Sequence, residues 1–73
     1  MPRLKIAAEL NATVAKIEVE KGTRVESDAT LLLLESMKVE IPVTAPRAGT
    51  VAEILVAEGE AIKEGQTLFV LDV

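Results

Sequence analysis

The sequence contains no cysteine and no histidine. Without cysteine there are no disulfide bonds, and the two absences together exclude zinc clusters of the cysteine–histidine type and most nucleophile–histidine catalysis. A metal site would need oxygen ligands only, yet no aspartate-rich loop of the calcium-binding kind is present. The sequence therefore favours a protein that does not perform chemistry through a metal or a histidine base.

Aromatic residues and basic charge are also scarce. Phe69 is the one aromatic side chain, which leaves nothing on which nucleotide bases could stack. Twelve acidic residues against eight basic ones give a formal net charge of −4. Because nucleic acids and anionic membranes select for basic patches, we expect neither as a partner.

Long hydrophobic runs are missing as well. A membrane helix needs roughly 18 apolar residues, whereas Leu31–Leu34 is only strand-sized. The first residues also lack the apolar stretch and cleavage site of a signal peptide. We expect a cytoplasmic protein whose 73 residues form a single domain (1–73). The start at a methionine and the lack of a linker favour a free-standing protein.

The most informative feature that is present is an internal repeat. When the chain is displaced by 37 positions, residues 1–36 align with residues 38–73 without a gap. Conservatively matched apolar pairs include Leu4/Ile41 and Ile6/Val43. Identical pairs include Thr13/Thr50, Val14/Val51, Ile17/Ile54, Gly22/Gly59, Leu31/Leu68 and Leu34/Leu71. A shared core pattern would produce such matches, so we expect half-repeats 1–36 and 38–73.

Each half is expected to contain four short strands. Alternating or apolar patterns predict strands at Lys16–Glu20 and Glu53–Ala57, around Val25 and Ile62, and at Thr30–Glu35 and Thr67–Asp72. Apolar residues on both faces of Leu31–Leu34 predict burial on both sides, and a core position for Leu33. Turns are predicted at Ser27-Asp28 and at four glycines, which tolerate positive φ, namely Gly22, Gly49, Gly59 and Gly65.

Helix is a poor alternative, because the stretches between turns are short and Pro42 and Pro46 lie near the centre. Residues 7–20, rich in alanine and glutamate, are the one ambiguous segment, and strand is favoured there because the matching segment 44–57 contains Pro46 and Gly49. Two four-stranded halves, each too small to be stable alone, should combine around a shared core. The predicted fold is therefore all-β: a flattened antiparallel barrel or sandwich of two four-stranded sheets with pseudo-two-fold symmetry.

The repeat has an unrepeated joint at Met37-Lys38, which must link a strand ending at Glu35 to one beginning at Val39. Two-residue hairpins favour Asn-Gly and similar pairs because both central residues need positive φ. Met-Lys breaks this rule at an exposed, central position, where a functional site is expected. The base of Lys38 would be fixed while its side chain moves, as a tether requires. Met37 would offer a flexible apolar side chain to a partner. From these arguments alone, a functional tether at Lys38 and an ordinary solvated lysine are equal alternatives.

The run Glu35-Ser36-Met37-Lys38-Val39-Glu40-Ile41-Pro42, followed by Ala45-Pro46-Arg47-Ala48-Gly49, resembles the attachment site of biotin carboxyl carrier domains. That family has the pattern Glu-Ala-Met-Lys-Met, with an Ala-Pro-x-x-Gly turn at this distance, and the two-half β fold inferred above. The resemblance covers almost the whole chain. It fits the single-domain type, because the gapless repeat leaves no room for the protruding insertion of some bacterial acetyl-CoA carboxylase carriers.

Two residues depart from the family pattern. Ser36 replaces the usual alanine, which is a change between small residues. Val39 replaces the second methionine and favours the related lipoyl domains, whereas Met37 favours biotin because lipoyl domains carry an acid there. A lipoyl carrier domain and an unmodified lipoyl-like interaction module are the alternatives to a biotin carrier.

The resemblance implies that biotin protein ligase attaches biotin covalently to Lys38. The tethered biotin would then carry a carboxyl group from a biotin carboxylase to a carboxyltransferase, and the domain itself would be a non-catalytic part of a biotin-dependent carboxylase. Glu35, Ser36, Met37, Val39 and Glu40 would contribute to recognition by the ligase or the carboxylase partners. The resemblance implies no metal.

Overall fold

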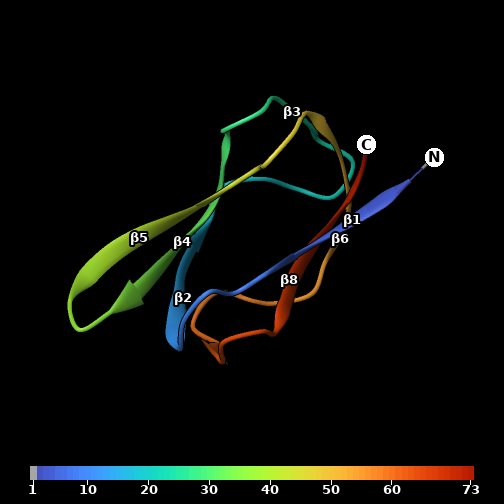
Figure 1. Cartoon of the computed structure of the whole chain (residues 1–73). Helices are drawn as coiled ribbons and strands as arrows, with labels where there is room; N and C mark the ends of the chain where they lie inside the picture. Colours follow the sequence, from blue (N-terminus) through green and yellow to red (C-terminus); the bar gives the residue numbers. More distant parts are fainter. Residues whose placement is uncertain (1) are drawn as a thin grey trace.

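The computed structural model describes residues 2–73, and these residues form eight β-strands and no helix (Figure 1). No helix capable of crossing a membrane therefore occurs in the described part of the chain. The strands are β1 (Arg3–Ala7), β2 (Ala12–Ile17), β3 (Arg24–Val25), β4 (Thr30–Ser36), β5 (Val39–Thr44), β6 (Gly49–Ile54), β7 (Ala61–Ile62) and β8 (Thr67–Asp72).

The strands form two antiparallel four-stranded sheets, with the orders β1-β8-β6-β3 and β5-β4-β2-β7. Displacing the strand numbers by four converts one order into the other, so each sheet takes strands from both halves of the chain. The register irregularities also correspond, because the shift between Val14 and Lys16 recurs between Val51 and Glu53. The predicted all-β fold with pseudo-two-fold symmetry is confirmed.

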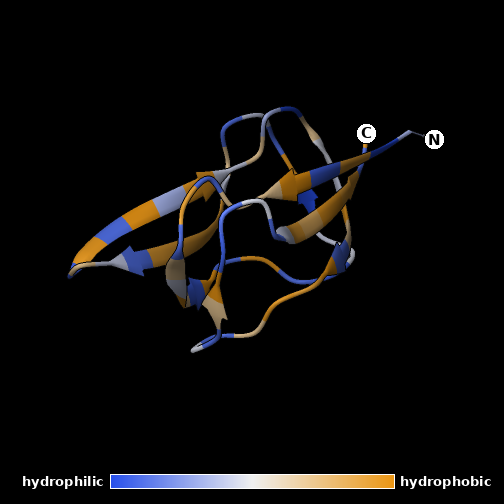
Figure 2. Ribbon diagram, turned by 60° about the horizontal axis from the view of Figure 1, so that its bottom comes forward, coloured by the Kyte–Doolittle hydropathy of each residue, from blue (hydrophilic) through white to orange (hydrophobic). Residues whose placement is uncertain are grey.

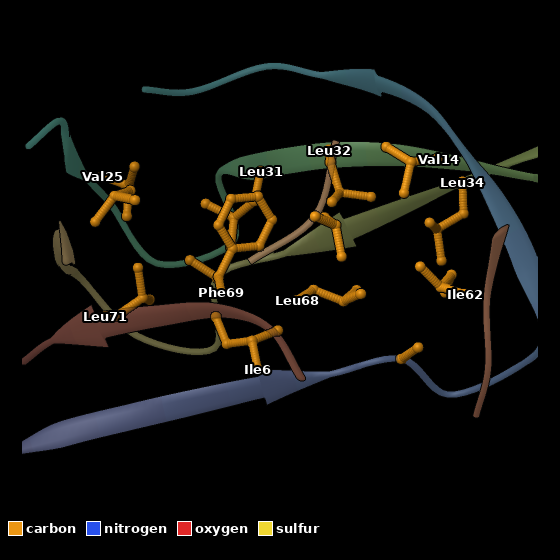
Figure 3. Packing of buried hydrophobic residues seen from close by; sticks show 14 residues of the cluster. Ile6, Val14, Val25, Leu31, Leu32, Leu34, Ile62, Leu68, Phe69 and Leu71 are labelled. Atoms are coloured by element: carbon orange, nitrogen blue, oxygen red, sulfur yellow. The ribbon is translucent and has the colours of Figure 1, made fainter. Parts of the chain in front are cut away.

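The core lies between the two sheets (Figure 3). Phe69 of β8 packs there with leucines from β4 and β8, and the largest side chains are almost completely removed from solvent. These are Val14, Leu31, Leu32, Leu34, Val51, Leu68, Phe69 and Leu71. Each half contributes to the same cluster, which explains why matched apolar positions recur at the repeat distance.

Leu33 differs from its neighbours in β4, and its predicted core position is wrong. Leu31, Leu32 and Leu34 are fully buried, whereas Leu33 is only partly buried and lies outside the core cluster. The register shifts between Thr30 and Leu32, so two consecutive leucines enter the core before the strand alternation resumes. Leu33 then faces outward, opposite Pro42 of the edge strand.

The turns follow the glycine prediction at three positions. Gly22, Gly59 and Gly65 have φ of 91°, 88° and 89°, and Asp28 takes the place equivalent to Gly65 with φ of 70°. Gly49 is not a turn residue, contrary to the prediction. It begins β6 and is buried, and a Cβ atom there would lie 2.6 Å from the Asp72 carbonyl oxygen. Close approach of two strands, and not backbone freedom, requires this glycine.

Two predicted strands are displaced. The alternating segments 16–20 and 53–57 were expected to be strands, but β2 ends at Ile17 and β6 ends at Ile54. Beyond those residues the chain leaves the sheet, although Glu18 N still donates to Leu31 O at 2.9 Å. Ile17 and Val19 nevertheless pack against the core, because alternation fixes which side of the chain is buried even where the ladder stops.

The molecule is elongated, with extents of 36 × 18 × 17 Å. The β4–β5 hairpin projects from the body at one end, and the two chain ends lie together at the other (Figure 1). Val73 N donates to Pro2 O at 3.0 Å, which holds the chain ends side by side. The hairpin tip is therefore the most prominent part of the molecule, remote from the termini.

Candidate modification site

The tip of the projecting hairpin is a two-residue turn formed by Met37 and Lys38. Ser36 pairs with Val39 across the turn, and both central residues adopt the left-handed conformation, with φ of 53° for Met37 and 67° for Lys38. Two-residue hairpins require this conformation because its twist matches that of the flanking strands. The fold therefore imposes on Met37 and Lys38 a backbone conformation that neither residue favours.

The side chains at the tip are unusually exposed. Met37 is 93% exposed and Val39 is 59% exposed, the two highest values among the large hydrophobic residues of the described range 2–73. Lys38 is exposed and forms no ion pair with any residue between 2 and 73. The hairpin thus presents a lysine amine to solvent between two apolar side chains.

Hydrophobic and hydrophilic residues alternate along β5 (Figure 2). Because successive side chains of a strand point to opposite sides, the hairpin has two distinct faces. Ser36 and Val39 continue the inner face of the hairpin, on which Leu34 enters the core. Glu35 and Glu40 lie on the outer face, directly opposite each other and exposed to solvent. The structure therefore brings all six residues of the predicted site together, with an acidic outer face and an inner face formed by Ser36 and Val39.

The opposite end of the molecule provides an internal comparison for the acidic pair. Arg3 and Asp72 occupy the register positions that correspond to Glu40 and Glu35, and they form an ion pair of 3.2 Å. Opposite charges across a strand pair stabilise a sheet, whereas like charges destabilise it. Since the same position accommodates an ion pair, the fold itself does not require two carboxylates at the tip.

We expect the double substitution Met37→Asn, Lys38→Gly to raise the free energy of unfolding by about 1–2 kcal/mol, because Asn and Gly tolerate positive φ. Urea denaturation of the unmodified protein measures this change. Lys21→Gly is the matched control: Lys21 is also exposed but has no positive φ. There, glycine should lower stability by about 0.5–1 kcal/mol. A destabilised double variant would show that the tip stores no strain.

A hollow beside the tip was not predicted from the sequence. It is lined by the end of β4 and by residues near β2 and β7, including Asn11, Ile62 and Lys63. These residues come from three separate parts of the chain, of which only the end of β4 belongs to a recognisable motif. Only the sheet order β5-β4-β2-β7 brings them beside the hairpin.

No group of metal-ligating side chains accompanies the tip: residues 2–73 contain no cluster of three or more acidic residues placed to hold an ion. What the geometry offers is an exposed primary amine at the tip of a projecting hairpin. This arrangement suits covalent attachment of a group that has to reach into another protein. Carrier domains are the class of protein that such a site on such a fold defines.

Comparison with known families agrees. Residues 5–71 match the family described as "Biotin-requiring enzyme", which comprises biotin- and lipoyl-attachment domains. The match spans nearly the whole chain, and the chain belongs to this family.

Two relatives match over almost their full length. The biotin/lipoyl attachment protein of Bacillus subtilis is 34% identical over 68 residues, which cover 93% of each chain. The biotinylated protein TB7.3 homolog of Mycobacterium leprae is 39% identical over 66 residues, covering 90% of this chain and 93% of that protein. The resemblance to biotinyl domains is therefore confirmed.

Solved structures show the same fold within large carboxylases. The urea carboxylase of Kluyveromyces lactis matches with a TM-score of 0.92 and 25% identity, over 99% of this chain and 6% of that one. A single-chain, multi-domain long-chain acyl-CoA carboxylase matches with a TM-score of 0.88 and 29% identity, over 93% of this chain and 7% of that one. The dihydrolipoyllysine-residue acetyltransferase component of the pyruvate dehydrogenase complex of Pseudomonas aeruginosa is 38% identical over 60 residues, which cover 82% of this chain and 11% of that protein.

Proposed function

We propose that Lys38 carries covalently bound biotin and that the domain moves a carboxyl group from a biotin carboxylase to a carboxyltransferase. The single observation that carries this proposal is the position of Lys38 in a strained, fully projecting two-residue turn, preceded by a Met37 that is 93% exposed. Membership of the biotin-requiring family supports the choice of cargo.

Attachment by biotin protein ligase would proceed through a biotinyl adenylate. The Nζ atom of Lys38 attacks the activated carbonyl carbon, an amide bond forms, and the bond to AMP breaks. The lysine ammonium loses two of its three protons, to a ligase group or to water, because only the neutral amine is nucleophilic. The hairpin contributes access to this reaction, since nothing in the described part of the chain pairs with the lysine.

After attachment, the domain would act through effective concentration. A group tethered to a hairpin reaches two successive active sites without diffusing away, and a short flexible link gives local concentrations on the order of millimolar. The eight-stranded body fixes the base of the tether while the long alkyl arm moves. The domain itself needs no catalytic side chain for this role.

The proposal is tested by intact-mass measurement of the 73-residue protein after incubation with biotin ligase, biotin and ATP, and separately with lipoate ligase and lipoate. The expected result is the addition of one biotinyl group in the first reaction and no addition in the second. Lipoylation without biotinylation would establish the lipoyl alternative, which Val39 and the acetyltransferase relative from Pseudomonas aeruginosa favour. No addition in either reaction would indicate an unmodified interaction module.

Cargo choice should depend on Met37 more than on Val39. We expect Met37→Asp to lower the biotinylation rate by more than about tenfold, because the carboxylate would have to enter the apolar surface that receives the methionine. Val39→Met should change the rate by less than about tenfold, equivalent to about 1.4 kcal/mol in the transition state, since valine preserves strand propensity and apolar contact. Initial rates with biotin ligase measure both effects. A wild-type protein that accepts biotin poorly and is rescued by Val39→Met would make Val39 the specificity determinant.

The opposed carboxylates Glu35 and Glu40 should contribute to recognition by the ligase and lower the stability of the hairpin. Glu40→Arg would create opposite Glu35 the same charge pairing as Arg3–Asp72, so we expect the free energy of unfolding to rise by about 0.2–1 kcal/mol. The biotinylation rate should nevertheless fall, because a basic partner surface would meet a neutralised outer face.

Arg3→Glu is the matched control for this prediction. It would remove the ion pairs of Arg3 with Asp72 and Glu53 and put a third carboxylate beside them, so it should lower stability by at least that amount without changing the biotinylation rate. Denaturation curves and ligase rates for both variants separate the two effects. Unchanged biotinylation of Glu40→Arg would remove Glu40 from the recognition surface.

A further inference from the structure

The hollow beside the hairpin, called the tip hollow below, lies next to the proposed attachment site. Ala12 and the buried Ile62 line it from β2 and β7, and Ser36 and Met37 line it from the hairpin. Met37 directly precedes Lys38, so a group attached to Lys38 begins beside the hollow. The long alkyl arm of a biotinyl-lysine is flexible enough to fold back toward it.

In the other half of the molecule, a side chain covers the position equivalent to Ala12. The pairing of Thr50 with Asp72 sets Gly49 beside Val73. A Cβ atom on Gly49 would lie only 3.0 Å from the Val73 side chain, which therefore covers this position. At the hairpin end, the pairing of Thr13 with Glu35 sets Ala12 beside Ser36 in the same way.

Ser36 thus stands where the other half has a valine. The shorter hydroxymethyl group of serine does not cover Ala12 as Val73 covers Gly49, and both Ala12 and Ser36 line the open hollow. Serine also brings a hydroxyl group that can donate and accept hydrogen bonds. The presence of serine where the other half has valine therefore leaves the tip hollow open and makes its wall polar.

The chemistry of the tip hollow matches the ring system of biotin. The apolar surface of Ala12, Ile62 and Met37 suits the thioether side of the ring. Its rim is polar and carries both charges, with Thr13, Glu35 and Lys63 beside Asn11 and Ser36. Such a rim suits the ureido group, which has one carbonyl oxygen and two N–H groups. Asn11 is already oriented: its Oδ1 accepts from Glu64 N at 2.8 Å, which leaves its NH₂ group able to donate to the ureido oxygen. The Ser36 hydroxyl can accept from a ureido N–H.

We propose that the ring of the tethered biotin folds back into the tip hollow and rests there between visits to its partner enzymes. This proposal rests on the proposed biotinylation of Lys38. The docked ring is held by the Asn11 amide and the Ser36 hydroxyl over an apolar floor, and it leaves the hollow when a partner site binds it more tightly. Ser36 is then a positioning residue for the resting cofactor.

The test compares amide chemical shifts of the ¹⁵N-labelled protein in three forms: unmodified, biotinylated by the ligase, and carrying acetyl-lysine at position 38. Acetylation removes the same positive charge without adding a ring. We expect both modifications to shift residues near the turn, but only biotinylation to shift residues 11–13 and 61–63. A ring in free solution would give the same pattern for both modifications, and that result would overturn the proposal.

Two variants sharpen the test. Ser36→Val introduces the side chain that lies against Gly49 in the other half, so the biotin-specific shifts at residues 11–13 and 61–63 should disappear from its biotinylated form. Thr44→Val is the matched control: Thr44 is exposed at the far end of β5 and does not line the tip hollow, so this variant should retain them. Persistence of these shifts in Ser36→Val would also overturn the docking site.

Intact mass of each sample keeps the two proposals distinguishable. Complete biotinylation with shifts confined to the turn would overturn the docking site but leave the carrier function intact. A protein that the ligase does not modify would overturn both.

Discussion

Lys38→Arg is expected to abolish biotinylation completely. A guanidinium group keeps the positive charge and the length of the side chain but does not form the amide, because it is effectively never deprotonated. Streptavidin blotting and intact mass after incubation with biotin ligase measure the loss. Arginine should leave the free energy of unfolding within about 0.5 kcal/mol of the wild-type value, since the replaced side chain is exposed. The expected result is a folded domain without cargo.

The other lysines provide the controls. Lys5, Lys16, Lys21 and Lys63 are also exposed, but none lies in a two-residue hairpin turn. Lys63 is the most demanding comparison because it lines the hollow beside the tip. Lys63→Arg should be biotinylated at the wild-type level. Residual signal in Lys38→Arg would mean that a second lysine accepts biotin and that the turn does not define the site.

The largest effect on stability is expected at Leu32. Its side chain is fully buried between the sheets, so Leu32→Ala removes apolar contacts and leaves a cavity at a cost of about 2–5 kcal/mol. Domains of this size have a small total stability, and such a loss is enough to unfold much of the population at 37 °C. Urea and thermal denaturation followed by circular dichroism measure the change. The milder Leu32→Val keeps the measurement possible if the alanine variant does not fold.

Leu33 is the matched control at the next position of the same strand. It is only partly buried and faces away from the core, so Leu33→Ala should cost about 1 kcal/mol or less. The two substitutions remove the same atoms, and any difference reports their surroundings. Equal losses would place Leu33 in the core and contradict the observed register of β4.

The contrast between Leu32 and Leu33 also shows what the sequence could predict. Four consecutive leucines predict a strand, and β4 begins at Thr30 as expected. They do not indicate which leucine faces outward, because the register shift near Thr30 depends on the partner strand β5. Gly49 was misassigned for a similar reason: its requirement comes from Asp72, which is distant in sequence.

The site was more predictable than the details of the core. The repeat places its joint at Met37-Lys38. A two-residue turn requires positive φ at both central residues whatever their type, and Met37 and Lys38 adopt it in the structure. The opposition of Glu35 and Glu40 follows from the same turn. The hollow beside the tip could not be predicted, since it depends on how β2, β4 and β7 come together.

The pairing of the two chain ends has a consequence for how this domain can be combined with others. Pro2 and Val73 lie within one hydrogen bond of each other, at the end of the molecule opposite the hairpin. A polypeptide can therefore enter and leave the domain at a single point, so a host protein could accept it within a surface loop as readily as at a terminus. In either arrangement the junction with the host protein lies at the end of the domain opposite the hairpin. The hairpin, up to the full 36 Å length of the molecule away, would project into open space and sweep freely around its anchor.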